Sequence, residues 1–259
     1  MIDPRDYGLD NLPFGIVSDA RGGDKHAAVA FEDKVVDLDC LVHDGMLDAD
    51  SLLGAATLND FLGEGLDTWR AVRARLRHLL SDAASSDERA AVAKRTLPRD
   101  AVTMHLPVDV GDYVDFYSSI EHATNLGRIL RPNADPLPPN YRHIPIGYHG
   151  RSSTVVVSGT PVRRPHGQRK PPDAIAPTFG PSALLDVEIE MGWIAGTASV
   201  HGEPVWDLGE ARSRVSAAFS AVRTGSLGIK TDVNELGCHL FTRVRIPFAR
   251  NPESPSATA

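Results

Sequence analysis

Between Leu185 and Met191 the chain alternates apolar and acidic residues, in the order Leu-Asp-Val-Glu-Ile-Glu-Met. Successive side chains of a β-strand point to opposite faces, so this alternation predicts a strand with one apolar face and one acidic face that carries Asp186, Glu188 and Glu190. Neighbouring carboxylates repel one another, so such a face is typical either of a site for a divalent cation or of a solvated sheet surface. For Glu188 and Glu190 alone, both interpretations stay open.

A third carboxylate that could join such a site lies earlier in the chain. Asp115 opens the segment Asp-Phe-Tyr-Ser-Ser, and His122 follows closely. Together with Glu188 and Glu190, Asp115 would offer three carboxylates to a hard cation such as Ca²⁺ or Mg²⁺. Asp115 could also cap a helix that starts at Phe116, which is a common structural use of aspartate. His122 taken alone is more typical of a surface or helix-start residue than of a general base.

Composition narrows the class of protein. The chain has 259 residues, 42% of them hydrophobic, and 34 acidic against 27 basic residues give a net charge of −7, which disfavours binding to nucleic acid or anionic membranes. Cys40 and Cys238 have no CxxC spacing, which argues against a disulfide framework or a thiolate zinc site. The N-terminus lacks the features of a signal peptide, and no apolar run is long enough to span a membrane. We therefore expect a cytoplasmic protein.

The first hundred residues predict a small β-rich opening followed by helices. Short strands are expected over 14–17, 27–31 and 35–38, with a polar turn between the last two. From Leu58 onward the apolar positions have helical spacing, with Thr57 and Asp60 as candidate N-terminal caps, and Gly63 and Gly65 are expected to divide the region into two helices.

Residues 81–99 are rich in alanine and charged residues and predict the connection between two domains, with the boundary near 100–110. Beyond it, a short strand is expected over 154–157. The proline-dense stretches 132–145 and 165–181 are expected to be loops or sheet edges, because proline cannot donate a ladder hydrogen bond.

Several ordered motifs resemble the fumarylacetoacetase family, and the similarity runs from roughly residue 10 to residue 214. The motifs are NLPFG at 11–15, TMHLP at 103–107, GDYVDFYSS at 111–119, HATN at 122–125, GYHGR at 147–151 and VSGTP at 157–161.

The resemblance implies a mainly β fold with some α, in which a small N-terminal SH3-like β-barrel domain precedes an incomplete β-rich catalytic domain of the fumarylacetoacetase type. It implies domains at 1–105 and 106–215, then a divergent tail at 216–259. It also implies a homodimer and a small diketo-acid substrate. Carried over position by position, Asp115, Glu188 and Glu190 match metal ligands for Ca²⁺ or Mg²⁺, His122 matches the general base, and Tyr117, Arg131 and Tyr148 match substrate contacts.

The implied reaction is hydrolysis of the C–C bond of 4-fumarylacetoacetate to fumarate and acetoacetate, in the degradation of tyrosine and phenylalanine. In it a metal polarises the diketone and His122 activates water. After about residue 215 the expected Asn-Asp-Trp-Ser-Ala-Arg-Asp motif does not follow. We therefore expect a chain that is truncated or frameshifted there. A remnant without catalysis that keeps part of the metal site is the alternative reading.

Overall fold

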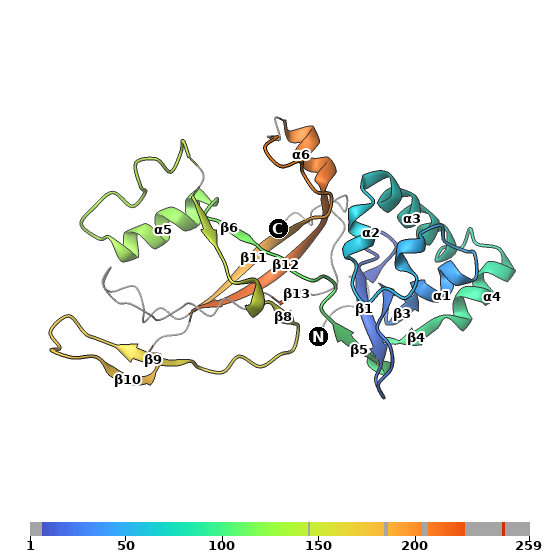
Figure 1. Ribbon diagram of the computed structural model, residues 1–259, viewed down its shortest axis with the longest axis horizontal. Coiled ribbons are helices and arrows are strands. Elements are labelled where there is room, and N and C mark those ends of the chain that lie inside the picture. Colours follow the sequence, from blue (N-terminus) through green and yellow to red (C-terminus); the bar gives the residue numbers. More distant parts are fainter. Residues whose placement is uncertain (1–6, 145, 184–185, 204–206, 226–244, 247–259) are drawn as a thin grey trace. The chain divides into compact units, whose positions relative to one another are not determined.

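The computed structural model describes residues 7–144, 146–183, 186–203, 207–225 and 245–246. The chain divides into two units, one formed by residues 1–109 together with 156–259 and the other by residues 110–155. Figure 1 shows the helices and strands of both units, and each unit is considered separately below.

A five-stranded antiparallel sheet organises the N-terminal part of the first unit (Figure 1). Its strand order is β4-β3-β2-β1-β5, with β4 and β5 at the two edges, and the sheet curls into a half-barrel. The two-residue turn after β2 places Glu32 at a φ of 53°, the backbone sign that tight antiparallel hairpins require. The strands are β1 (Phe14–Asp19), β2 (His26–Phe31), β3 (Lys34–Asp37), β4 (Thr96–Pro98) and β5 (Val102–His105).

Helices beside this sheet supply much of the buried core. The longest, α3, buries Trp69, Val72, Leu76 and Leu79, which recur at helical spacing on one face. Burial of a large apolar side chain of this kind stabilises the fold by about 1.5–3 kcal/mol. The helices are α1 (Leu38–His43), α2 (Asn59–Gly63), α3 (Leu66–Leu79) and α4 (Ser86–Lys94), with short 3₁₀ turns η2 (Asp50–Leu52) and η3 (Arg99–Ala101).

Most of the predicted secondary structure of this part is confirmed. The three opening strands and the division of the helical region near Gly63 and Gly65 are present. The capping prediction was wrong, because α2 begins after Leu58 without a side-chain cap. Its place is taken by tertiary contact, since the backbone N–H of Leu58 donates to the carbonyl of Pro107 at 2.7 Å.

The prediction that residues 81–99 connect two domains was wrong. This segment holds α4 and the edge strand β4, which pairs with β3. The missed signal is a capping box, in which the hydroxyl of Ser85 accepts from the N–H of Glu88 at 3.2 Å and the carboxylate of Glu88 accepts from the N–H of Ser85 at 2.9 Å. Pro98 is compatible with a strand here because β4 lies at the sheet edge.

The later part of the first unit consists of short ribbons and one long ribbon. The long one pairs β11 with β12 in antiparallel register, and it places Glu188 opposite Arg223 and Glu190 opposite Ala221 along the backbone. The proline-dense segment 165–181 forms a two-stranded ribbon, in keeping with the predicted loops or edges. The elements are β8 (Val156–Val157), β9 (His166–Arg169), β10 (Thr178–Pro181), β11 (Asp186–Ala195), α6 (Leu208–Arg214), β12 (Val215–Gly225) and β13 (Arg245–Ile246).

The second unit, residues 110–155, is built from a small ribbon and a helix. Strand β6 (Val114–Phe116) pairs with β7 (Gly147–His149), and α5 (Ile120–Leu130) lies between them in sequence. The proline-dense stretch from 132 forms turns, as predicted. Of the expected strand at 154–157 only the second half is β8, because Ser152–Thr154 form the 3₁₀ turn η4.

The mainly β class with some α, which the sequence predicted, is confirmed by these sheets and helices. The predicted tail at 216–259 is described only over the rest of β12 and over β13, so residues 226–244 and 247–259, with Cys238, lie outside the described residues. The domain limits stay a prediction. No helix in the described ranges has both the length and the apolar character needed to cross a membrane.

Candidate functional site

Two of the predicted site residues face each other in the β6–β7 ribbon. Asp115 and Tyr148 are direct partners in the antiparallel register. Residues directly opposite in such a pair project their side chains to the same face, with Cβ atoms about 4.5–5.5 Å apart. The half-buried carboxylate of Asp115 and the exposed ring of Tyr148 therefore share one face of the ribbon.

Tyr117 continues this face and leads to His122. The backbone N–H of Tyr117 donates to the carbonyl of Ile146 at 3.1 Å, which extends the pairing one step past β6. Tyr117 is two residues beyond Asp115, and alternation places both on the same side of an extended segment. The rings of Tyr117 and His122 meet edge to face with centroids 5.9 Å apart. The second unit thus gathers Asp115, Tyr117, His122 and Tyr148 within one short stretch of structure.

The start of α5 positions His122 in its first turn. Ser119 is the N-cap, and its hydroxyl accepts from the backbone N–H of His122 at 3.3 Å. The helix begins at Ile120 and Asp115 lies in β6 instead, so the alternative in which Asp115 caps a helix from Phe116 was wrong. The cap leaves the imidazole of His122 on the exposed surface of the helix.

Arg131 closes α5 and holds the loop that follows. It is the C-cap residue, and its Nη2 donates to the carbonyl of Pro136 at 2.6 Å. The same loop approaches the helix so closely that a Cβ on Gly127 would lie 1.9 Å from the carbonyl oxygen of Pro136. One N–H of the guanidinium is therefore committed to a tether, and the others stay available for a ligand.

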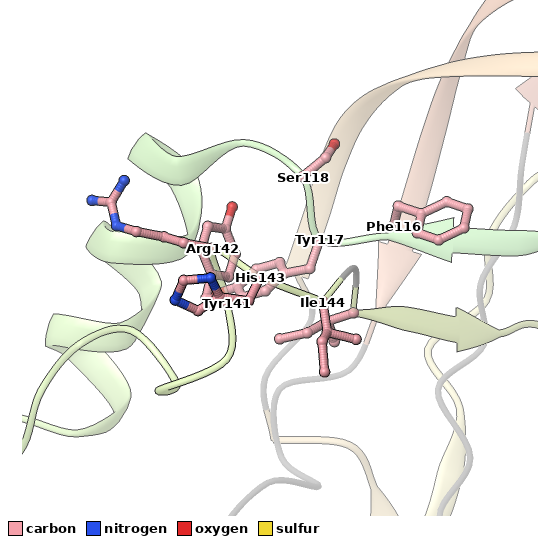
Figure 2. A pocket seen from close by; sticks show the side chains of 8 residues that line it. Phe116, Tyr117, Ser118, Tyr141, Arg142, His143 and Ile144 are labelled. Carbon is pink, nitrogen blue, oxygen red and sulfur yellow. The ribbon is translucent and has the colours of Figure 1, made fainter. Parts of the chain in front are cut away.

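A pocket of about 330 Å³ opens in the same unit, between the end of β6 and the segment before β7. Figure 2 shows its lining, which combines apolar, aromatic and polar side chains. Tyr117 was predicted from the sequence, whereas the lining residues from Tyr141 onward were not. The signal available for them was the Tyr-Arg-His triplet inside an otherwise proline-dense loop. The lining residues are Phe116, Tyr117, Ser118, Tyr141, Arg142, His143, Ile144 and Ile146.

An ion pair at the far end of the ribbon was also missed. Nε2 of His149 lies 2.7 and 2.8 Å from the two carboxylate oxygens of Asp112. The N–H of Tyr113, which donates to that carboxylate at 2.8 Å, and then His149 hold the pKa of Asp112 below its usual value. The pair ties the loop before β6 to β7, beside the position where Asp115 meets Tyr148.

The other two predicted metal ligands lie in the first unit. Glu188 and Glu190 are two residues apart in β11, so the predicted strand is present. Their donor chemistry, together with that of Asp115, fits a hard divalent cation, because all three supply carboxylate oxygens. Within the ranges that the structure describes, no group of three or more His, Cys, Asp or Glu side chains is clustered as a metal site. The union of the three carboxylates stays a prediction.

The chain is similar to known proteins over most of its length. Residues 10–107 match the family "Fumarylacetoacetase N-terminal". The chain is 40% identical over 206 residues to the fumarylacetoacetase of Rattus norvegicus, an alignment that covers 77% of this chain and 49% of the relative. It is 43% identical over 197 residues to that of Caenorhabditis elegans (74% and 47%) and 39% identical over 220 residues to that of Oryza sativa subsp. japonica (81% and 51%).

The fold and the family match define a mainly β protein whose residues 10–107 match an N-terminal domain of the fumarylacetoacetase type. The resemblance of the chain to the fumarylacetoacetase family, first indicated by its motifs, is thereby confirmed. The chain spans about half the length of the curated relatives it matches.

Proposed function

We propose that this protein is a hydrolase that cleaves the C–C bond of 4-fumarylacetoacetate to give fumarate and acetoacetate. The reaction would take place in the cytoplasm, in the degradation of tyrosine and phenylalanine. The observation that carries the proposal is the grouping of Asp115, Tyr117, His122 and Tyr148 in one small unit of a chain about 40% identical to fumarylacetoacetases. In metal-assisted hydrolysis of a diketone a carboxylate can hold the cation and an imidazole can take the proton of water, while phenol groups can orient the substrate.

Asp115, Glu188 and Glu190 are the residues proposed to hold Ca²⁺ or Mg²⁺. A divalent cation bound there would polarise the attacked carbonyl and offset the negative charge that develops on the departing carbon fragment. His122 acts as general base, taking a proton onto its imidazole from the water that attacks the carbonyl. General-base catalysis of this kind contributes typically about 10²- to 10⁴-fold to the rate.

The neighbours of His122 support this role. The edge contact with Tyr117 and the helix cap at Ser119 restrict where the imidazole can lie. Orientation of this kind limits the motion that would separate the base from its water. Tyr148 is proposed to donate its hydroxyl to a substrate oxygen from the same face as Asp115, and Arg131 to offer its remaining N–H groups to a substrate carboxylate.

The experiment is a turnover assay on the purified chain with fumarylacetoacetate. His122→Gln removes the base but keeps a side chain of similar size, so we expect turnover to fall by about 10²-fold or more. His201→Gln is the matched control, because His201 is another exposed histidine in the described part of the chain. Equal activity of the two variants would contradict the role of His122.

A protein without catalysis that keeps part of the metal site is the second candidate, because the Asn-Asp-Trp-Ser-Ala-Arg-Asp motif expected after about residue 215 does not follow there. It predicts that the folded chain, saturated with Ca²⁺ or Mg²⁺, leaves fumarylacetoacetate unchanged. The hydrolase proposal predicts release of fumarate under the same conditions. We further propose that the protein acts as a homodimer, which sedimentation of the purified chain would test.

A further inference from the structure

We propose that the pocket lined by residues 116–118, 141–144 and 146 is a carboxylate subsite in which Arg142 binds one carboxylate of the substrate. The inference deepens the proposed function and rests on it for the identity of the substrate. Some of the hydrogen-bond donors in the second unit already donate to acceptors within the protein.

Of the three substrate contacts expected from the family resemblance, Tyr117 and Arg131 already donate hydrogen bonds within the protein. The hydroxyl of Tyr117 donates its only proton to the carbonyl of Ala123 at 3.2 Å, so toward a ligand its oxygen can only accept. A carboxylate has only acceptor atoms and gains nothing from such a partner. One N–H of the Arg131 guanidinium already donates to the carbonyl of Pro136. The strongest remaining donors must be sought elsewhere in the unit.

Arg142 and Tyr141 line the pocket and keep their donors. Within the described residues the guanidinium of Arg142 makes neither a hydrogen bond nor an ion pair, and its side chain is exposed. The hydroxyl of Tyr141 is buried and has no hydrogen-bond partner in the described structure. A buried hydroxyl without a partner destabilises the protein, and a bound acceptor removes that cost. A carboxylate supplies the acceptor atoms that both groups lack.

The shape of the pocket also suits a short unsaturated acid. Its volume of about 330 Å³ lies at the small end of ligand pockets, and apolar side chains of Phe116, Ile144 and Ile146 complete the wall (Figure 2). The rings of Tyr117 and Tyr141 meet edge to face with centroids 6.0 Å apart, which stiffens the aromatic side. His122 touches the same Tyr117 ring, so a ligand in the pocket lies close to the proposed base.

Equilibrium binding of fumarate to the full chain tests the subsite without requiring turnover. Arg142→Met keeps the aliphatic bulk and removes the charge, and we expect it to weaken fumarate binding by about tenfold to a hundredfold, the range for a lost charge-assisted hydrogen bond. Arg142→Lys should recover part of the affinity. Arg128→Met removes an exposed arginine of α5 and should change the affinity by less than about twofold. Unchanged affinity in Arg142→Met would overturn the proposal.

Tyr141→Phe separates a ligand contact from an incidental buried hydroxyl. If the hydroxyl of Tyr141 contacts the ligand, its removal should weaken fumarate binding by about fivefold to tenfold, while the thermal stability of the free protein stays the same or rises. As an incidental group, its removal would leave affinity unchanged and so count against the subsite.

Competition with inorganic phosphate tests whether the pocket is specific for a carboxylate. Competition by phosphate as strong as that by fumarate would contradict a carboxylate subsite, and weaker competition supports one. Failure of the proposed function gives a different result, namely normal fumarate binding without cleavage of fumarylacetoacetate. Failure of the subsite alone would appear as normal cleavage with an unaltered Michaelis constant in Arg142→Met.

Discussion

Asp115 and Tyr148 are direct partners across the antiparallel pair β6–β7, although they are far apart in the sequence. This pairing puts a candidate metal ligand and a candidate substrate contact on one face of a two-stranded ribbon. A slip of the register by one residue would send them to opposite faces. The arrangement of the site therefore depends on the contacts that fix this register.

Tyr148→Phe tests what this shared face does. The change removes one hydroxyl and leaves the backbone pairing intact, so we expect the Michaelis constant for fumarylacetoacetate to rise by about fivefold to tenfold through loss of one hydrogen bond. Steady-state kinetics measure it. Tyr113→Phe is the matched control, because Tyr113 lies in the same unit and is not among the proposed substrate contacts. Equal Michaelis constants for both variants would argue against a ligand contact by Tyr148.

Gly127→Ala is expected to destabilise the second unit even though alanine favours helices. The new Cβ would lie 1.9 Å from the carbonyl oxygen of Pro136, so the loop tethered by Arg131 must move. We expect a loss of about 1–3 kcal/mol in the free energy of unfolding, typical of an overpacked site. Urea unfolding measures it.

Gly63→Ala is the control, because a Cβ there meets nothing within 4 Å and the residue lies in α2. A neutral or stabilising effect is expected for it. If Gly127→Ala were also neutral, the close approach of the loop to α5 would be wrong.

The sequence predicted those parts of the fold that local pattern determines. Alternation predicted the strand that carries Glu188 and Glu190, and short apolar runs predicted β1, β2 and β3 of the five-stranded sheet but neither β4 nor β5. It missed α4, whose capping box is a local signal, because the alanine-rich composition of the segment indicated a connection.

The site was less accessible to this reasoning. The proposed roles of His122 and Tyr117 came from the family resemblance, and the pairing of Asp115 with Tyr148 depends on long-range register. The contribution of Arg142 could not be predicted, because it depends on which neighbouring donors are already bonded within the fold.

Glu88 is expected to make the stability of the first domain depend on acid pH. The backbone N–H and hydroxyl of Ser85, then Arg75 and His78, lower the pKa of Glu88 from 4.5 to about 2. A carboxylate with a lowered pKa in the folded state contributes stability that is fully present above its unfolded-state pKa of 4.5 and is lost as the pH falls toward 2.

Thermal melts of wild type and Glu88→Gln between about pH 6 and pH 2 measure how this stability depends on pH. Wild type should melt at the higher temperature above pH 4.5, and the difference should shrink as the pH approaches 2. Glu64→Gln is the control, since Glu64 is exposed at the end of α2. A difference that is constant with pH would show that the bonds of Glu88 do not depend on its charge.

The most direct test of the account is the rate of fumarylacetoacetate hydrolysis as a function of free Ca²⁺ and Mg²⁺, for wild type, Asp115→Asn and the exposed control Asp173→Asn. We predict that chelator abolishes wild-type activity, that added cation restores it, and that Asp115→Asn needs at least about tenfold more cation because one charged ligand is lost. Asp173→Asn should follow wild type. Hydrolysis that is indifferent to chelator, or equal cation requirements in the two variants, would contradict a metal-dependent site built on Asp115.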